Sequence, residues 1–313
     1  MWQGKKHDMR VTFWGVRGSI PCPGPDTIHY GGNTSCVELL LENPRRRIII
    51  DAGSGIRELG NALMGQIGQG ANTIEADIFL THTHWDHIMG FPFFTPIYIP
   101  TTRLTIHGPV TYEEETLKEI LGGQWTYRYF PVRHEELSSQ VTYVDLKEGS
   151  YDLGQGLHLK TKYLNHPLLC LGYRFEYQGK VFCTAYDTEP FSNLFITDPE
   201  DPDFDAVMAA EGEEAAAREN QRIETFIRDA DLLVFDTQYT QKEYDQNRRG
   251  WGHSPMEYAV DVARRNRVKQ LALFHHDVQR SDRQMDELAE VYCRPEKEGP
   301  HIFFAREGMQ VCL

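Results

Sequence analysis

The stretch from Leu80 to Gly90, LTHTHWDHIMG, contains the residues of this chain whose types and spacing could do chemistry. Three imidazoles and one carboxylate fall within six positions of it: His82, His84, Asp86 and His87. Imidazole nitrogens and carboxylate oxygens together are the donor set of a divalent metal site. A histidine-rich surface turn is the simpler alternative, but four such donors directly after an apolar run do not arise readily that way. We therefore interpret the stretch as metal-binding.

The spacing also predicts how the donors are shared. In an extended segment, side chains alternate, so that His82, His84 and Asp86 would share one side while His87 falls out of phase. One metal could then bind the first two histidines. A second metal could bind Asp86 and His87.

The overall charge bears on the partner. The chain has 313 residues, of which 32 are basic and 46 acidic, giving a formal net charge of −14. Such a charge repels polyphosphate backbones at long range, so we expect no long nucleic acid as a partner. A small anionic substrate is compatible with it, because bound cations can dominate the local field.

The cysteines and the apolar runs bear on location. Six cysteines are scattered without a CxxC pair: Cys22, Cys36, Cys170, Cys183, Cys293 and Cys312. The first residues lack the apolar core of a secretory signal, and no apolar run approaches the roughly twenty residues that cross a bilayer. We expect reduced thiols, a cytoplasmic location and no membrane span. A homo-oligomer is compatible with the sequence.

The elements that must position the donors are short apolar strands and amphipathic helices. Strands are expected at 10–15, 36–41, 47–50, 103–109, 140–145, 157–163, 172–177, 180–184, 232–235 and 271–274. Helices are expected at 56–64, at 112–121 with Thr111 as a cap, at 213–228, at 254–266, and after Ser281. Residues 198–205, DPEDPDFD, are expected to form a surface loop. Asp51 ends a strand, and we interpret it as a buried carboxylate that supports the metal loops.

This pattern predicts one domain over residues 1–313 of the α/β (α+β) class. Its two mixed sheets would be sandwiched between helical layers. Three further candidate ligands follow apolar strands: His166, Asp187 and His275. Strand ends combine a rigid scaffold with loop access, which suits metal ligands. Simpler interpretations are a packed loop histidine for His166 and an Asx-turn carboxylate for Asp187. His276 adjoins the same strand as His275 and competes with it.

With these residues the chain resembles the metallo-β-lactamase superfamily, whose HxHxDH motif is matched at every position by His82, His84, Asp86 and His87. The resemblance implies a four-layer αββα sandwich with a dinuclear site at its edge. By that resemblance His82, His84 and His166 would bind one metal. Asp86, His87 and His275 would bind the other, with Asp187 as the bridge. Two divalent cations are implied, with zinc the best fit and manganese or iron as alternatives.

Further segments are similar to the phosphodiesterase branches of the superfamily, such as the tRNA 3′-processing endonuclease and the phosphonate-pathway cyclic phosphodiesterase. These segments are FWGVRGS, YGGNTSC, a strand ending in DAG, and GHSP. In the RNA endonuclease a histidine paired with an acidic residue assists the leaving group, and His253 and Asp236 match those positions. The simpler interpretations are a loop residue before a helix for His253 and a strand-end cap for Asp236.

The stretch from His166 to Asp187 is too short for the basic or Gly/Pro-rich arm that grips tRNA in those endonucleases. Together with the net charge, this predicts a hydrolase for a small phosphodiester such as a cyclic nucleotide. A hydroxide bridging the metals would be the nucleophile, Asp86 would orient it, and His253, held by Asp236, would protonate the leaving alkoxide. Two alternatives remain: a thioester or lactone hydrolase, and a metal-dependent sensor or binding protein without turnover.

Overall fold

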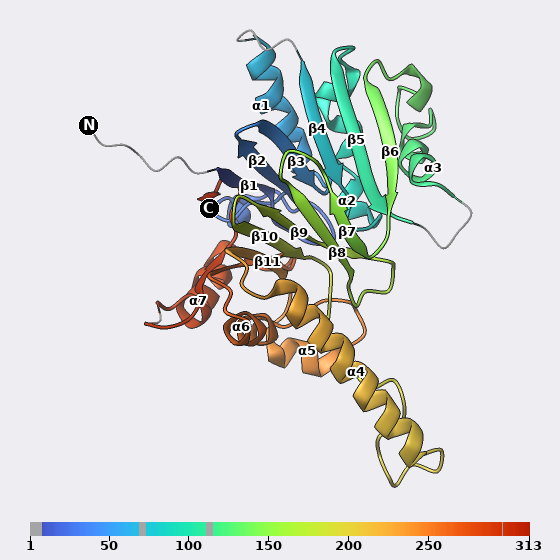
Figure 1. The fold of residues 1–313 in the computed structure, drawn as a ribbon, viewed down its shortest axis with the longest axis vertical. Coiled ribbons are helices and arrows are strands. Elements are labelled where there is room, and N and C mark those ends of the chain that lie inside the picture. The colour runs from blue at the N-terminus through green and yellow to red at the C-terminus, as the bar shows by residue number, and fades with distance from the viewer. Residues whose placement is uncertain (1–7, 69–72, 111–114, 296) are drawn as a thin grey trace.

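Two seven-stranded sheets lie face to face in the computed structural model, with helices on their outer faces (Figure 1). The structure describes residues 8–68, 73–110, 115–295 and 297–313. This arrangement confirms the predicted four-layer sandwich of mixed sheets between helical layers.

The first sheet has the strand order β14-β1-β2-β3-β4-β5-β6. Its strands are β1 (Met9–Gly15), β2 (Cys36–Glu42), β3 (Arg45–Ile50), β4 (Ile74–Phe79), β5 (Thr102–Pro109), β6 (Gln140–Leu146) and β14 (Gln310–Cys312). Strands β3 to β6 are parallel to one another, whereas β14, β1, β2 and β3 pair antiparallel. The histidine-rich stretch 80–90 therefore leaves the sheet at the carboxyl end of a parallel strand, β4.

The second sheet has the order β13-β12-β11-β10-β9-β8-β7. Its strands are β7 (Gly149–Asp152), β8 (His158–Tyr163), β9 (Leu171–Tyr177), β10 (Lys180–Ala185), β11 (Leu232–Asp236), β12 (Gln270–Phe274) and β13 (His301–Phe304). Strands β10 to β13 are parallel. Because parallel strands end at the same edge, the segments after β10, β11 and β12 emerge side by side.

The main core fills the space between the sheets. Phe79 of β4 has its ring centroid 5.4 Å from that of Tyr173 and 5.3 Å from that of Phe175, both on β9. All three side chains are buried completely. The two sheets are thus joined by aromatic packing next to the strand end from which the histidine-rich stretch 80–90 emerges.

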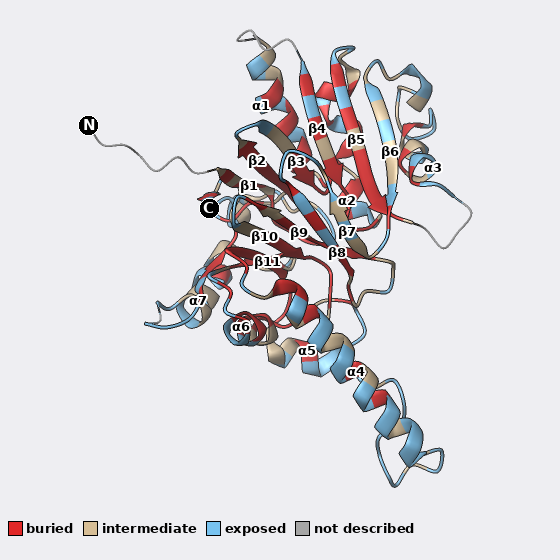
Figure 2. Cartoon of the chain, in the orientation of Figure 1, coloured by how far each residue is buried: buried red, intermediate tan, exposed pale blue. Residues whose placement is uncertain are grey.

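Helices form the outer layers. They are α1 (Ile56–Gly68), α2 (Trp85–Ile88), α3 (Leu117–Gly122), α4 (Ala206–Ile227), α5 (Gln241–Asn247), α6 (Met256–Arg265) and α7 (Asp282–Tyr292). Helices α1 and α3 pack on the first sheet, and α4, α6 and α7 on the second, through two further apolar clusters. Figure 2 shows the contrast between buried strands and exposed outer helix faces.

Several predicted boundaries are wrong. Helix α4 begins at Ala206 rather than Glu213, because the Asp205 carboxylate caps it by accepting hydrogen bonds from the backbone N–H groups of Val207 and Met208. Helix α3 begins only at Leu117, capped by Thr116. The proposed Thr111 cap lies outside the described residues. Strands β7, β13 and β14 and helices α2 and α5 were not predicted, since they are short.

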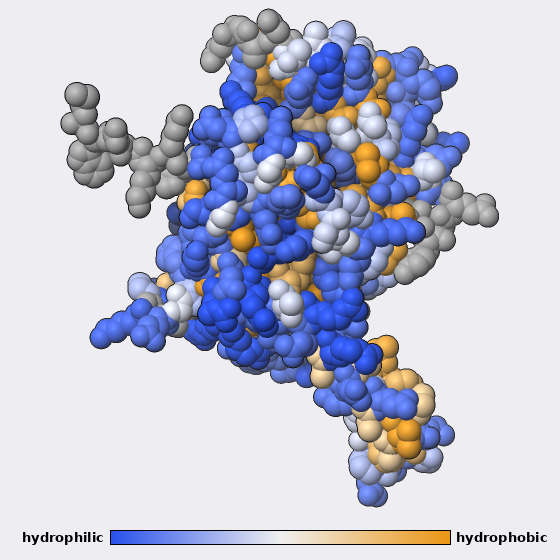
Figure 3. All heavy atoms as spheres, in the orientation of Figure 1, coloured by the Kyte–Doolittle hydropathy of each residue, from blue (hydrophilic) through white to orange (hydrophobic). Residues whose placement is uncertain are grey.

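The N-terminal end of α4 and the loop before it project from the body as an arm, which we define as residues 191–212 (Figure 1). Figure 3 shows apolar residues on the surface of this projecting part. Within the arm, Leu194 is 92% and Val207 65% exposed. The sequence from residue 188 to 217 is acid-rich and contains neither lysine nor arginine. None of the described helices is long and apolar enough to span a bilayer.

The core between the sheets predicts a large effect for Phe175→Ala. Removal of a fully buried ring at this contact should lower the free energy of unfolding by about 3–5 kcal/mol, through lost burial and the cavity left behind. Denaturant unfolding measures this change. Phe195→Ala on the exposed arm is the control, expected to change the free energy of unfolding by less than about 0.5 kcal/mol. Equal effects of the two variants would contradict the assignment of this core.

Candidate metal centre

The histidine-rich stretch 80–90 changes conformation in its middle. His82 and His84 lie in the irregular segment after β4, whereas Asp86 and His87 lie on the short helix α2. The expectation of one extended segment is therefore wrong beyond His84, whose backbone is the last extended position before the helix. The helical turn matters because it brings Asp86 and His87, which extended backbone would place on opposite sides, to the same cluster.

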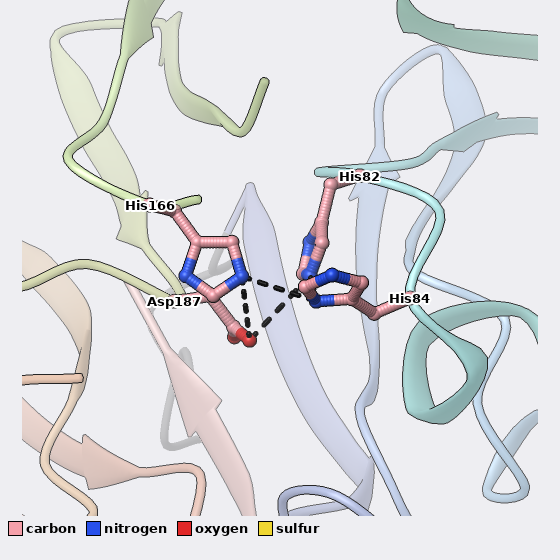
Figure 4. Close-up of side chains that lie close together, drawn as sticks. All are labelled: His82, His84, His166 and Asp187. Atoms are coloured by element: carbon pink, nitrogen blue, oxygen red, sulfur yellow. Dashed lines mark hydrogen bonds and ion pairs between the residues drawn. The ribbon is translucent and has the colours of Figure 1, made fainter. Parts of the chain in front are cut away.

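The first cluster joins three histidines and one aspartate from three strand ends: His82, His84, His166 and Asp187 (Figure 4). His84 Nδ1 lies 2.9 Å from His82 Nε2 and 3.1 Å from His166 Nε2. Asp187 Oδ2 lies 3.6 Å from His82 Nε2 and 4.0 Å from His166 Nε2. The donor atoms of these four residues all lie within 4.8 Å of one another, close enough for one ion to be bound by them.

The second cluster lies beside the first and consists of Asp86, His87, Asp187 and His275. His87 Nε2 is 3.4 Å from Asp86 Oδ2 and 3.2 Å from Asp187 Oδ1. His275 Nε2 is 3.1 Å from Asp86 Oδ2 and 3.4 Å from Asp187 Oδ1. All four residues are buried.

Asp187 belongs to both clusters through different oxygens. Its Oδ2 faces the first cluster and its Oδ1 the second. Asp187 Oδ1 and His87 Nε2 are buried and lie 3.2 Å apart, but neither makes a well-aligned hydrogen bond among the described residues. Buried polar atoms almost always make one, so this pair fits clusters that could hold cations.

The pKa values of the histidines agree with this fit. Burial lowers the pKa of His82 well below its usual value and that of His166 to about 4, so that both imidazoles are neutral and can offer a lone pair. Burial also acts to lower the pKa of His87, but the carboxylates of Asp187, Asp86 and Asp51 outweigh it and raise that pKa well above its usual value. The second cluster therefore attracts positive charge strongly.

Asp51, at the end of β3, supports the second cluster from behind. Its Oδ2 lies 2.7 Å from His87 Nδ1, and its Oδ1 accepts a hydrogen bond of 2.7 Å from the Thr81 backbone N–H. A carboxylate at Nδ1 orients the ring so that Nε2 faces the cluster. The geometry thus matches the supporting position expected for Asp51.

The loop after β1 also supports the second cluster, and sequence reasoning missed its role. The Ser19 backbone N–H donates a hydrogen bond of 2.7 Å to Asp86 Oδ2. At Gly18, an added Cβ would collide with the His275 ring. In the sequence, the RGS segment at 17–19 points to this loop only through its similarity to the phosphodiesterase branches.

Of the two neighbouring histidines after β12, His275 joins the cluster. The Nε2 of His276 instead lies 2.9 Å from the backbone oxygen of Ala305. His275 has a left-handed φ of 62°, and the chain there turns so that consecutive rings point to different surroundings.

The structure also brings His253 and Asp236 together beside the clusters. His253 Nδ1 lies 2.8 Å from Asp236 Oδ2, and the His253 ring stacks on that of His275 with centroids 4.9 Å apart. Burial acts to lower the pKa of His253, but Asp236 outweighs it and raises the pKa to about 9. The imidazole can therefore carry a proton at neutral pH.

Comparisons with known proteins show similarity to one superfamily of proteins. Residues 31–147 match the family model of the metallo-beta-lactamase superfamily. The ribonuclease Z of Exiguobacterium sibiricum is 28% identical over 63% of this chain and 70% of its own length. The ribonuclease BN of Enterobacter sp. strain 638 is 26% identical over 97% of this chain and 100% of its own length.

Among solved structures, the metallo-beta-lactamase fold protein YhfI from Bacillus subtilis superposes with a TM-score of 0.63. The superposition covers 98% of this chain and 99% of that chain at 15% sequence identity, a likeness of fold. We expected no long nucleic acid as a partner. The names of the ribonuclease relatives partly conflict with that expectation. The chain is thus similar in sequence to the metallo-beta-lactamase superfamily over residues 31–147, and its fold is similar to that of a metallo-beta-lactamase fold protein.

Proposed function

We propose that this chain is a dinuclear metal-dependent phosphodiesterase for a small phosphodiester such as a cyclic nucleotide. His82, His84 and His166 would hold one cation, Asp86, His87 and His275 the other, and Asp187 both. Zinc suits this histidine and aspartate set best, with manganese or iron as alternatives. Divalent cations held there would supply a nucleophile from water near neutral pH and neutralise charge on the phosphoryl oxygens.

The observation that carries the proposal is the His253–Asp236 pair at the edge of the second cluster. A phosphodiester needs a proton donor for its departing alkoxide, and an imidazolium oriented by a carboxylate is suited to that task. Asp236 holds Nδ1 of His253, which leaves Nε2 as the atom that would give the proton. In a thioester or lactone hydrolase, this pair would not have the role of protonating the alkoxide that leaves a phosphodiester.

Asp86 would orient the attacking water. Its Oδ2 accepts the Ser19 backbone hydrogen bond and lies 3.1 Å from His275 Nε2, so the carboxylate is fixed from two sides. A fixed acceptor contributes to catalysis because little reorganisation is needed during reaction.

The acid-rich arm supports a small substrate over a long RNA. It follows Asp187 along the chain, and its sequence offers no lysine or arginine to neutralise phosphates. Binding of a long nucleic acid depends mainly on such contacts. Because the relatives are named ribonucleases, RNA is the alternative substrate, and the activity assays described below include it.

The shared carboxylate predicts a pattern of metal content. Wild-type protein should bind two equivalents of zinc, His166→Ala one tight equivalent, and Asp187→Ala neither tightly, because Asp187 supplies a donor to both clusters. Asp51→Asn should weaken one equivalent by about 10- to 100-fold through loss of His87 orientation. Zinc titration followed by elemental analysis measures this.

Asp77→Asn is the matched control, since Asp77 is a carboxylate on β4 that pairs with Arg46 at 2.9 Å. It should leave the metal content unchanged. A folded wild-type protein that takes up fewer than two equivalents at saturating zinc would refute the dinuclear assignment.

The leaving-group role predicts a selective defect in His253→Ala. The variant should keep its metals but lose about 10²–10⁴ in turnover of cyclic nucleotides, whose alkoxide leaving group needs a proton. Turnover of bis(p-nitrophenyl) phosphate should fall much less, because p-nitrophenolate leaves without one. Steady-state rates on both substrates measure the difference.

His301→Ala, an exposed histidine on β13, is the control and should match wild type on both substrates. Equal losses of His253→Ala on the two substrates would remove the proton-donor role. A short RNA with a 3′ extension belongs in the same series. Preference for it over cyclic nucleotides by a large factor would replace the small substrate in the proposal.

A further inference from the structure

A small cavity lies between the loops that leave β11 and β12 at the edge carrying Asp236 and His275. Its volume is about 220 Å³. The side chains that line it include Gln246 of α5, Tyr239 and Arg248 from the segments flanking α5, and Gln279, Arg280 and Gln284 after β12. None of these residues has a role in the metal centre described above.

One residue that lines this cavity, Tyr239, contacts a residue beside the metal clusters. The Tyr239 ring lies 6.1 Å from the His253 ring, measured between centroids. The Arg248 guanidinium lies 5.7 Å from the centroid of Tyr239 and 4.5 Å from that of Trp251. Contacts of this kind hold a guanidinium plane in place. Tyr239, which lines the cavity, therefore contacts the ring of the proposed proton donor.

The loop of Arg248 is also tied to the first cluster. The Gly252 backbone oxygen lies 3.1 Å from His166 Nδ1, and Gly252 has a left-handed φ of 81°. A Cβ added at Gly252 would collide with the His166 ring. Close approach of this loop to a metal-cluster histidine thus depends on glycine. The loop that carries Arg248 of the cavity lining thus also contacts a histidine of the first cluster.

The lining is polar and nearly balanced in charge. Arg280 donates to Glu243 at 2.6 Å, and Asp277 also lines the cavity, so carboxylates offset the two guanidinium groups. A phosphate would meet these carboxylates. Gln246 and Gln279 instead offer carboxamides, each of which presents a donor and an acceptor. The carboxamide oxygen of Gln284 already accepts hydrogen bonds from Ser281, so this residue offers its N–H donors.

Carboxamides match the hydrogen-bonding edges of nucleobases, and aromatic and guanidinium planes stack on their faces. The volume also limits the ligand. Pockets for drug-sized molecules begin at about 300 Å³, so the cavity suits a single ring system.

We propose that this cavity binds the nucleobase of a nucleotide phosphodiester whose phosphate is held at the metal centre. The proposal deepens the proposed function and rests on it for the phosphate. Substrate selection then depends on the base through Gln246, Arg248 and the residues facing them, separately from the residues that hold cations.

The test begins with nucleosides, which carry a base and no phosphate. Isothermal titration of adenosine, guanosine, cytidine and uridine into wild-type protein should detect at least one with a Kd of about 1 mM or tighter. Gln246→Trp, which fills the cavity, and Arg248→Ala should each weaken that binding by about tenfold or more. Lys242→Trp on the same helix and Arg249→Ala, whose guanidinium pairs with Asp245, are matched controls expected to bind as wild type does.

Kinetics provide the second measurement. The two cavity variants should raise KM for the p-nitrophenyl ester of the matching nucleoside 5′-monophosphate by about tenfold, with little change in kcat. The KM for bis(p-nitrophenyl) phosphate, which has no base, should stay within about twofold.

Three results would overturn the inference: no nucleoside binding by wild type, unchanged binding in Gln246→Trp, or an equal rise in KM for both substrates. Displacement of the nucleoside by inorganic phosphate in metal-free protein would also do so, since it would show a phosphate site. Nucleoside binding without hydrolysis of any phosphodiester would support the cavity while refuting the proposed function, so the two can fail separately.

Discussion

The buried carboxylate of Asp187 is the constraint on which the rest of the site depends. It is 2% exposed, and its two oxygens face two different sets of histidines. An ionised carboxylate without positive charge nearby costs several kcal/mol to bury. Histidines lie on both sides of this carboxylate. The pKa of His82 in the first cluster is lowered, so that its imidazole is neutral, whereas the pKa of His87 in the second cluster is raised, so that its imidazole can carry positive charge. Both clusters are thus arranged around one negative charge, which the proposed cations would offset.

The backbone shows how firmly the scaffold holds these groups. Asp51, Asp187 and His275 all have left-handed φ values, of 61°, 33° and 62°. Each follows within two residues of a strand end, where the chain must turn away from the sheet. Such conformations cost about 1–3 kcal/mol each and persist only where the surroundings enforce them. The sheets, joined by Phe79 and Phe175 just behind the site, provide that enforcement.

Much of the fold could be predicted because apolar runs and strand ends are local signals. The donors at 82–87 were recognisable from type and spacing alone. The assignment of His166, Asp187 and His275 as ligands depended on the resemblance to the superfamily. Single residues far apart in the sequence form no pattern of their own. The turn into α2 was missed because a four-residue helix leaves no periodicity. The start of α4 was missed because Asp205, in an acidic stretch, reads as loop and is in fact a cap.

The same limit explains why the cavity could not be predicted. Tyr239, Arg248 and Gln279 lie on separate loops, and only the parallel order of β11 and β12 brings them to one edge. Their convergence has a consequence for recognition in an acidic protein. A net charge of −14 opposes the approach of any anion, so under the proposed function the attraction for a phosphodiester would be confined to the two clusters and the cations they would hold. Recognition through hydrogen bonds and ring stacking is not weakened by that charge. In this proposal the clusters would hold the phosphate, and the almost neutral cavity would distinguish its substituent.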